Sequence, residues 1–198
     1  MKKALLGAVV GQAGFSHKLG KRALWWGALG GAIPDFDLLP IAFMGPWGEF
    51  LYHRGPTHAL WFGPVAGSVL GYAVWRGHAS KYRNETVADE GVQNRETENG
   101  LHPPGHPALL TSWIGLFVLT LLSQPFLDVF TTYGTQLFTP FSNRRFALDA
   151  VPIIDPAYSL ILIAALVIWS RTTPKKRIRV GRRAAAIALV LSTAYLFY

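Results

Sequence analysis

The stretch ALLTSWIGLFVLTLLSQPFLDVF, residues 108–130, decides the fold class of this 198-residue chain. It is an almost uninterrupted apolar run. About 20 apolar residues, rising roughly 1.5 Å each, are needed to cross the hydrocarbon core of a bilayer. A single acidic residue, Asp128, stands close to the end of the run. The run therefore predicts a membrane-spanning helix that carries a carboxylate to one membrane face.

The rest of the chain has the same layout, because apolar blocks alternate with short polar stretches. Hydrophobic residues make up 51% of the sequence and charged residues only 15%. These proportions predict an all-α integral membrane protein: one domain over residues 1–198, a bundle of about five to six transmembrane or half-membrane helices with a polar site near one face. Besides residues 108–130, the expected spans are residues 23–45, 57–75 and 151–170, with shorter segments at 4–15 and 184–198.

The polar residues between the spans predict how the chain lies in the membrane. A dense basic stretch at 171–183 and a second one at 17–22 fall on the same side when the chain is threaded through the spans, as the positive-inside rule requires. The net charge of +8 is thereby explained by topology, so we expect a lipid bilayer as the partner and no nucleic acid. Residues 76–107 are expected to form a flexible polar loop, and the last segment is expected to stop inside a helix.

Two further features of the sequence concern packing and metal chemistry. Glycine pairs four residues apart let helix backbones approach closely in lipid, although glycine is also simply common in membrane helices. The absence of cysteine excludes disulfides and thiolate metal sites. The glycine pairs are Gly7/Gly11, Gly27/Gly31 and Gly67/Gly71.

The same threading gathers acidic and histidine residues on the face opposite the basic stretches. An Asp at the centre of a membrane helix costs on the order of 3 kcal/mol, so such a group calls for a function. Oxygen and imidazole donors without sulfur suit zinc, manganese or magnesium. We therefore expect a divalent-metal site, whose candidate ligands are Asp35, Asp37, His53, His58 and Asp128. Asp155 is interpreted instead as the cap of the next helix, and His17, His78, His102 and His106 are not expected to be ligands.

Local sequence supports this convergence. Pro34 disturbs a regular helix, so a partly extended segment 34–37 would let both carboxylates face the same way. Thr57 is a good N-cap for the span that follows, which would place His58 at its start. Gln124 precedes Asp128 by four residues and should therefore lie on the same helix face.

Three short motifs contain the candidate residues: GGAIPDFD at 30–37, YHRGPTH at 52–58 and LDVFTTYG at 127–134. They resemble those of the YdjM-like family of bacterial inner-membrane proteins, which are described as metal-dependent hydrolases. The resemblance implies a multi-pass inner-membrane protein with the five ligands named above. Two positions depart from the family pattern. Gln124 stands where members often have His, and Lys2-Lys3 stand where they commonly have a Thr-His or Thr-Gln pair.

Together these observations predict a membrane-embedded metal-dependent hydrolase that acts on a lipid-linked or phosphoester substrate at the extracytoplasmic face. A metal-activated water would attack, with Arg54, His58 and Asp128 as the catalytic residues. Arg54 would steady the developing negative charge, and Arg144 and Arg145 on the same face could grip an anionic group. Two alternatives stay open: a non-enzymatic protein that binds or transports a divalent metal, and a structural bundle without metal.

Overall fold

The computed structural model describes residues 2–37, 54–88, 105–150, 152 and 155–197, and within these ranges its regular secondary structure is all helical, with no strand. The all-α expectation is confirmed. The six α-helices within these ranges are α1 (Lys2–Leu19), α2 (Arg22–Ala32), α5 (Phe62–Ala88), α7 (Leu110–Val129), α8 (Pro156–Arg171) and α9 (Pro174–Tyr195). Short 3-10 helices lie at η1 (Ile33–Asp37), η2 (Pro56–His58) and η3 (Pro107–Leu109).

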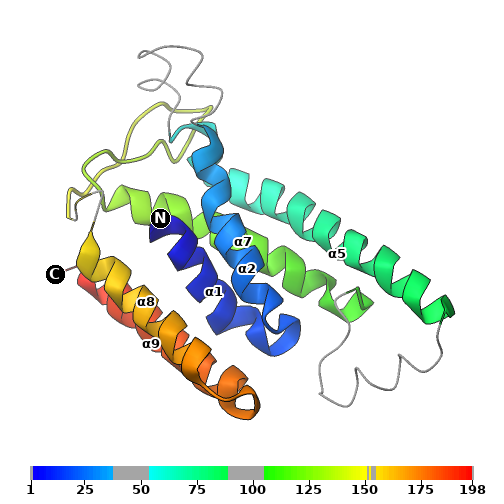
Figure 1. Ribbon diagram of the computed structural model, residues 1–198. Helices are drawn as coiled ribbons and strands as arrows, with labels where there is room; N and C mark the ends of the chain where they lie inside the picture. Colours follow the sequence, from blue (N-terminus) through cyan, green and yellow to red (C-terminus); the bar gives the residue numbers. More distant parts are fainter. Residues whose placement is uncertain (1, 38–53, 89–104, 151, 153–154, 198) are drawn as a thin grey trace.

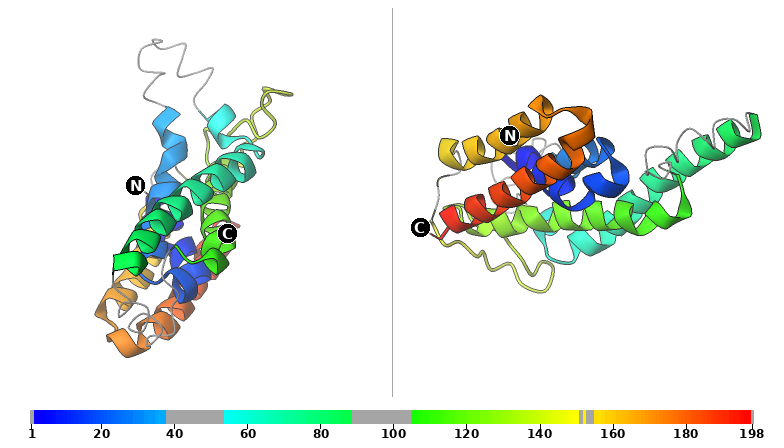
Figure 2. Two further views of the ribbon diagram at one scale, coloured as in Figure 1. Left: turned by 90° about the vertical axis from the view of Figure 1, so that its right-hand side faces the viewer. Right: turned by 90° about the horizontal axis from the view of Figure 1, so that it is seen from below.

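The central helix of the bundle is α7, which packs against α1, α2 and α5 (Figure 1). Its Trp113, Leu116, Phe117 and Leu121 are almost completely buried. Helices α8 and α9 form a hairpin that covers α1 on the side away from α5 (Figures 1 and 2). The first turn of α1 and the last turn of α7 lie at the same end of the bundle, and this end carries the polar residues described below.

Helices α1 and α2 are held together by glycine. They form an antiparallel hairpin that turns at Gly20, whose φ of +60° is a conformation that glycine adopts without strain. A methyl group added to Gly7 would collide with the carbonyl oxygen of Gly27, and one added to Gly31 would collide with the carbonyl oxygen of Lys3. The expectation that these glycines allow close backbone approach is confirmed, and Gly67 and Gly71 do the same for α5 against α7.

Several helix boundaries differ from those predicted. The helix expected to start at residue 57 begins at Phe62 and continues to Ala88, so the first part of the predicted polar loop is helical. One physical reason is that the His78 ring stacks on Trp113, with ring centroids 5.2 Å apart, and so ties this turn of α5 to the core. The last helix starts at Pro174 rather than at residue 184, because proline is favoured in the first turn of a helix. Most of the basic stretch at 171–183 therefore lies within α9.

The helix predicted over residues 23–45 is also shorter than expected. Helix α2 runs over Arg22–Ala32 and continues only as the 3-10 helix η1, while residues 38–53 lie outside the described part of the chain. The partly extended conformation considered for segment 34–37 is not formed, because these residues belong to the 3-10 helix η1. Proline is tolerated near the start of a helical turn, where its missing N–H would have no partner in any case.

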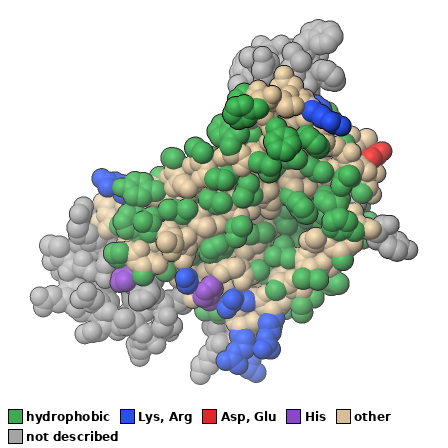
Figure 3. Space-filling model, turned by 180° about the vertical axis from the view of Figure 1, so that it is seen from behind, with side chains coloured by type: hydrophobic (Ala, Val, Ile, Leu, Met, Phe, Trp, Pro, Cys, Tyr) green, Lys and Arg blue, Asp and Glu red, His purple; other side chains and the backbone are tan. Residues whose placement is uncertain are grey.

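Of the helices described, Pro107–Val129 is the one that is long and apolar enough to cross a membrane, with a mean hydropathy of 1.5. Helix α8 is apolar but shorter. The multi-pass arrangement thus remains a prediction. Large hydrophobic side chains nevertheless stay exposed on α2, α5 and α9, as at Trp25, Val69 and Val190. Figure 3 shows hydrophobic side chains spread widely over one face, with the largest group of Lys and Arg at its lower end. Exposed apolar surface of this extent is typical of contact with lipid or another protein.

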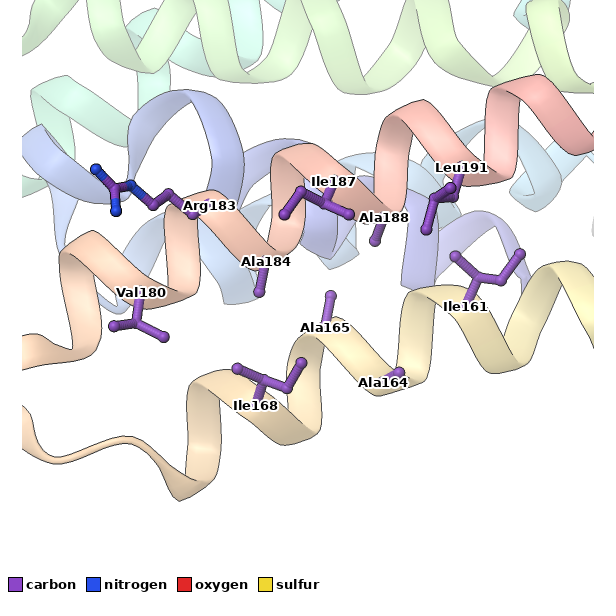
Figure 4. A pocket seen from close by; sticks show the side chains of 10 residues that line it. All are labelled: Ile161, Ala164, Ala165, Ile168, Val180, Arg183, Ala184, Ile187, Ala188 and Leu191. Atoms are coloured by element: carbon purple, nitrogen blue, oxygen red, sulfur yellow. The ribbon is translucent and has the colours of Figure 1, made fainter.

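A groove of about 560 Å³ separates α8 from α9 over part of their length (Figure 4). Its walls are apolar apart from Arg183, as expected for a surface that meets lipid chains. Of the predicted metal ligands whose side chains are described, Asp35, His58 and Asp128, none lines this groove.

Candidate functional site

Residues from distant parts of the sequence meet where η1, η2 and the end of α7 come together. The Nε2 atom of His58 lies 3.1 Å from Oδ2 of Asp128 and 3.8 Å from Oδ1 of Asp35. The Arg54 guanidinium approaches the other oxygen of Asp128, at 3.6 Å. Four of the residues singled out in the sequence are therefore neighbours in space. Two others are not described: His53 lies outside the described ranges, and of Asp37 only the backbone, at the end of η1, is described.

A fifth residue, Lys3, lies at the centre of this group. Its Nζ atom is 2.6 Å from Oδ1 of Asp35, 2.7 Å from Oδ2 of Asp128 and 3.0 Å from Nε2 of His58. Sequence reasoning noted Lys3 only as a departure from a family pattern. The sequence nevertheless contained an indication of its position. Threading the chain through the predicted spans puts the N-terminus, and with it Lys3, on the same membrane face as the acidic residues.

Asp128, like His58, has no exposed side-chain surface. Helix α7 ends one residue later, at Val129, and the chain turns so that the Thr131 hydroxyl donates a hydrogen bond to the Asp128 carbonyl. The same hydroxyl accepts a 2.9 Å hydrogen bond from the Arg54 guanidinium. One threonine thus links the Asp128 backbone to the Arg54 guanidinium, in addition to the attraction between the guanidinium and the Asp128 carboxylate.

Arg54 is held in an unusual backbone conformation. Its φ is +58°, which is uncommon for a residue other than glycine. The Arg54 carbonyl accepts hydrogen bonds from the backbone N–H of Gln136 and from the Thr135 hydroxyl, both at 3.1 Å. Strained backbone of this kind persists where the surroundings over-determine it, which often happens at functional sites.

The Arg54 guanidinium also stacks on an aromatic ring. It lies 5.0 Å from the centroid of Tyr133, and the Arg145 guanidinium lies 4.8 Å from the same centroid. The expectation that Arg145 belongs to this face is thereby supported. Arg144 lies instead over the ring of Phe146, at 5.6 Å. Two guanidinium groups on one ring form a local positive surface beside Asp128.

His58 is completely buried and is positioned by its short 3-10 turn, since its backbone N–H donates to the carbonyl of Gly55. Thr57 does not cap α5 as predicted, because α5 starts only at Phe62. The Thr57 hydroxyl lies instead 3.0 Å from Nδ1 of His58. A hydroxyl can either donate or accept, so this contact suits both neutral tautomers of the ring.

Gln124 occupies the position one turn before Asp128 on the same face of α7. It is fully buried, its amide nitrogen donates to the carbonyl of Thr120, and its Oε1 atom has no hydrogen-bond partner within the described residues. A buried carbonyl oxygen without a partner is costly. Gln124 therefore offers a neutral oxygen donor near the acidic end of the helix.

The side chains of this cluster include three groups of the kinds that bind divalent metal ions. Two carboxylates and an imidazole suit zinc, manganese or magnesium. The two carboxylates and the imidazole already surround one cation, because all three contact the Lys3 ammonium. Within the described residues, no three His, Asp or Glu side chains are spaced as ligands of a single ion. The donors thus suit a divalent metal in kind, whereas the position that they share is occupied by the Lys3 ammonium.

The residues that were not expected to bind metal lie elsewhere or have other contacts, except His102, which lies outside the described residues. Asp155 caps α8 by accepting from the backbone N–H of Tyr158 at 3.1 Å, so its interpretation as a cap is confirmed. His78 stacks on Trp113, and His106 caps η3 by accepting from the N–H of Ala108. His17 lies in the last turn of α1, at the opposite end from Lys3.

Comparison with known proteins gives a family match over nearly the whole chain. The family model described as YdjM inner membrane protein matches residues 2–198. A Bacillus subtilis (strain 168) protein described as "Uncharacterized protein YfhP" is 37% identical over 60 residues, which is 29% of this chain and 18% of that protein. The match thus spans less than a fifth of the length of this relative. No solved structure matches the chain.

Proposed function

The chain belongs to the YdjM inner membrane protein family, and on that premise we propose that it is a membrane-embedded hydrolase that depends on a divalent metal ion. The observation that carries the proposal is the approach of Asp35, His58 and Asp128, from three separate segments, to a single cation position. A bundle that needed these residues only to join its helices would not require all three to face one point. The proposed substrate is a phosphoester or another lipid-linked ester at the extracytoplasmic membrane surface.

Asp35, His58 and Asp128 would hold the ion, and Asp37 and His53 are proposed as further ligands from their positions in the sequence motifs. When bound, a divalent ion lowers the pKa of a coordinated water and so supplies a nucleophile at neutral pH. Burial of His58 and Asp128 keeps bulk water away from the ion and strengthens the electrostatic interactions there. The Thr57 hydroxyl keeps the imidazole oriented through Nδ1, as partners of metal-binding histidines generally do.

Substrate would enter past Asp35. Its side chain is 37% exposed, whereas those of Lys3, Arg54, His58 and Asp128 are buried. The cluster is therefore open on the Asp35 side and closed by α7 on the other. A site at one end of a membrane bundle suits a substrate whose reacting group lies at headgroup depth.

Arg54 is proposed to bind the anionic part of the substrate and to stabilise negative charge that develops on it. A guanidinium presents several N–H donors in a fixed plane and binds phosphate or carboxylate oxygens through paired hydrogen bonds. Contacts with Tyr133 and Thr131 fix that plane before substrate arrives. Preorganised donors of this kind are effective because they need no rearrangement during the reaction.

The test is hydrolysis by full-length protein purified in detergent. A long-chain alkyl phosphate and a long-chain carboxylic ester serve as substrates. Each is assayed with protein treated with a chelator and with the same protein after addition of manganese, zinc or magnesium. We expect metal-dependent turnover that is lost in His58→Ala and kept in His17→Ala, which removes a histidine at the opposite end of α1. Hydrolysis that survives chelation would contradict the proposal. Bound metal without turnover of either substrate would favour the alternative of a metal-binding or transporting protein.

A further inference from the structure

Lys3 is held in place within the cluster by contacts of the first turn of α1. Lys3 is not on a frayed chain end. Its carbonyl oxygen packs directly against Gly31 of α2, and its neighbour Lys2 donates from Nζ to the carbonyl of Pro152 at 3.2 Å. The Lys3 side chain reaches from this anchored turn into the cluster and is only 8% exposed. The ammonium is therefore a built-in part of the cluster.

Geometry makes the ammonium and a metal ion mutually exclusive. Divalent zinc or magnesium lies about 2.0–2.2 Å from its oxygen and nitrogen ligands. The three donors contact the ammonium at 2.6–3.0 Å, so an ion that bound all three would need the volume that Nζ occupies. Both cations cannot occupy this position at the same time.

Charge leads to the same conclusion. The cluster contains two cations, Lys3 and Arg54, and two anions, Asp35 and Asp128, so with His58 neutral its formal charge is 2 − 2 = 0. A divalent ion added beside a retained ammonium would raise that charge to +2 in a largely buried site. Uncompensated buried charge is strongly unfavourable. If the ion replaces the ammonium instead, the formal charge of the cluster rises only to +1.

We infer that the Lys3 ammonium is an internal competitor for the metal position, and that a divalent ion binds only after the Lys3 side chain has moved out. The inference rests on the proposed function, because it takes the Asp35, His58 and Asp128 cluster as the metal site. It adds a residue that controls loading of that site. Lys3 moves out on the side of Asp35, since this is the exposed edge of the cluster.

The competition has a measurable consequence. If Lys3 is out of the cluster in about one molecule in ten, the apparent dissociation constant of the metal is about tenfold weaker than its intrinsic value. Removing the charge while keeping an unbranched side chain should remove this penalty. The test is equilibrium dialysis of manganese or zinc against full-length protein in detergent, with bound metal measured by elemental analysis.

The variants are Lys3→Met, Lys3→Arg and, as the matched control, Lys18→Met in the last turn of the same helix. We expect Lys3→Met to bind about tenfold more tightly than the unaltered chain, and Lys3→Arg and Lys18→Met to bind no more tightly than it does. Adding Asp128→Asn to Lys3→Met should abolish the increase in metal affinity. That result would assign the increase to this cluster. Should Lys3→Met fail to fold, Lys3→Gln provides the same comparison with a polar side chain.

The outcomes separate this inference from the proposed function. Equal metal affinity in the unaltered chain and in Lys3→Met would overturn the competition and leave the metal site in place. Binding by neither would overturn the metal-dependent function and the competition together. Tighter binding by Lys18→Met as well would also overturn the inference, because the effect would then reflect net charge rather than the position of Lys3.

Discussion

His58 and Asp128 are both without exposed side-chain surface, and Nε2 of the histidine lies 3.1 Å from Oδ2 of the aspartate. This pair joins the turn at η2 to the end of α7. Because Lys3 and Arg54 also contact Asp128, the carboxylate balances positive charge from two other segments. The stability of this end of the bundle therefore depends strongly on one residue.

Replacing Asp128 by Asn should destabilise the protein by about 3–5 kcal/mol. The amide keeps the shape of the side chain but leaves two buried cations without their shared anion. Thermal unfolding in detergent provides the measurement. Asp149→Asn is the control, since Asp149 is exposed and should change stability by no more than about 0.5 kcal/mol. Equal melting temperatures for the two variants would show that the ion pairs around Asp128 contribute little.

Replacing Arg54 by Lys should lower kcat/KM for a phosphoester by about a hundredfold while the protein remains folded. Lysine keeps the charge but loses the planar set of donors and the stacking on Tyr133. The matched change is Arg144→Lys, because Arg144 stacks on Phe146 and has no contact with Asp128 among those observed. If both variants retain full activity, Arg54 does not bind the anion.

Replacing Gly7 by Ala should destabilise the α1–α2 hairpin by about 1–3 kcal/mol or more. The added methyl group meets the Gly27 carbonyl oxygen, and backbone cannot move aside as a flexible side chain can. Gly14→Ala in the same helix is the opposite case. Its methyl group would meet nothing within 4 Å, so it should stabilise the helix by roughly 0.5–1 kcal/mol. Thermal unfolding of the two variants tests the sign of each change.

The predicted membrane topology can be tested by cysteine labelling, since the chain contains no cysteine of its own. Asn143→Cys and Arg179→Cys each introduce one exposed thiol. An impermeant maleimide added to intact spheroplasts should label the first variant and spare the second, because the basic stretch at 171–183 is expected on the cytoplasmic side. Labelling of both, or of Arg179→Cys alone, would contradict this orientation.

The fold class and much of the cluster could be predicted from sequence because both depend on strong local signals. Apolar blocks predict helices, and the short motifs around Asp35, His58 and Asp128 indicated which polar residues share a face. Helix ends were predicted less well. Interactions such as the stacking of His78 on Trp113 lengthen α5, and they arise only once the bundle has formed. Threading the chain through the predicted spans places Lys3 on the correct face, but no local pattern pairs it with acids in distant segments, so its membership of the cluster was missed.

Arg54 combines two requirements that restrict how this position can vary. Glycine would relax the left-handed backbone but would remove the guanidinium, and asparagine tolerates the conformation without supplying a positive charge. A β-branched residue would satisfy neither requirement. In a library covering all substitutions at position 54, selection for folded protein alone should enrich glycine and asparagine, whereas selection for activity should recover arginine. Comparing the enrichment of glycine and asparagine in the first selection with that of arginine in the second would show how much stability is given up to keep the guanidinium in the site.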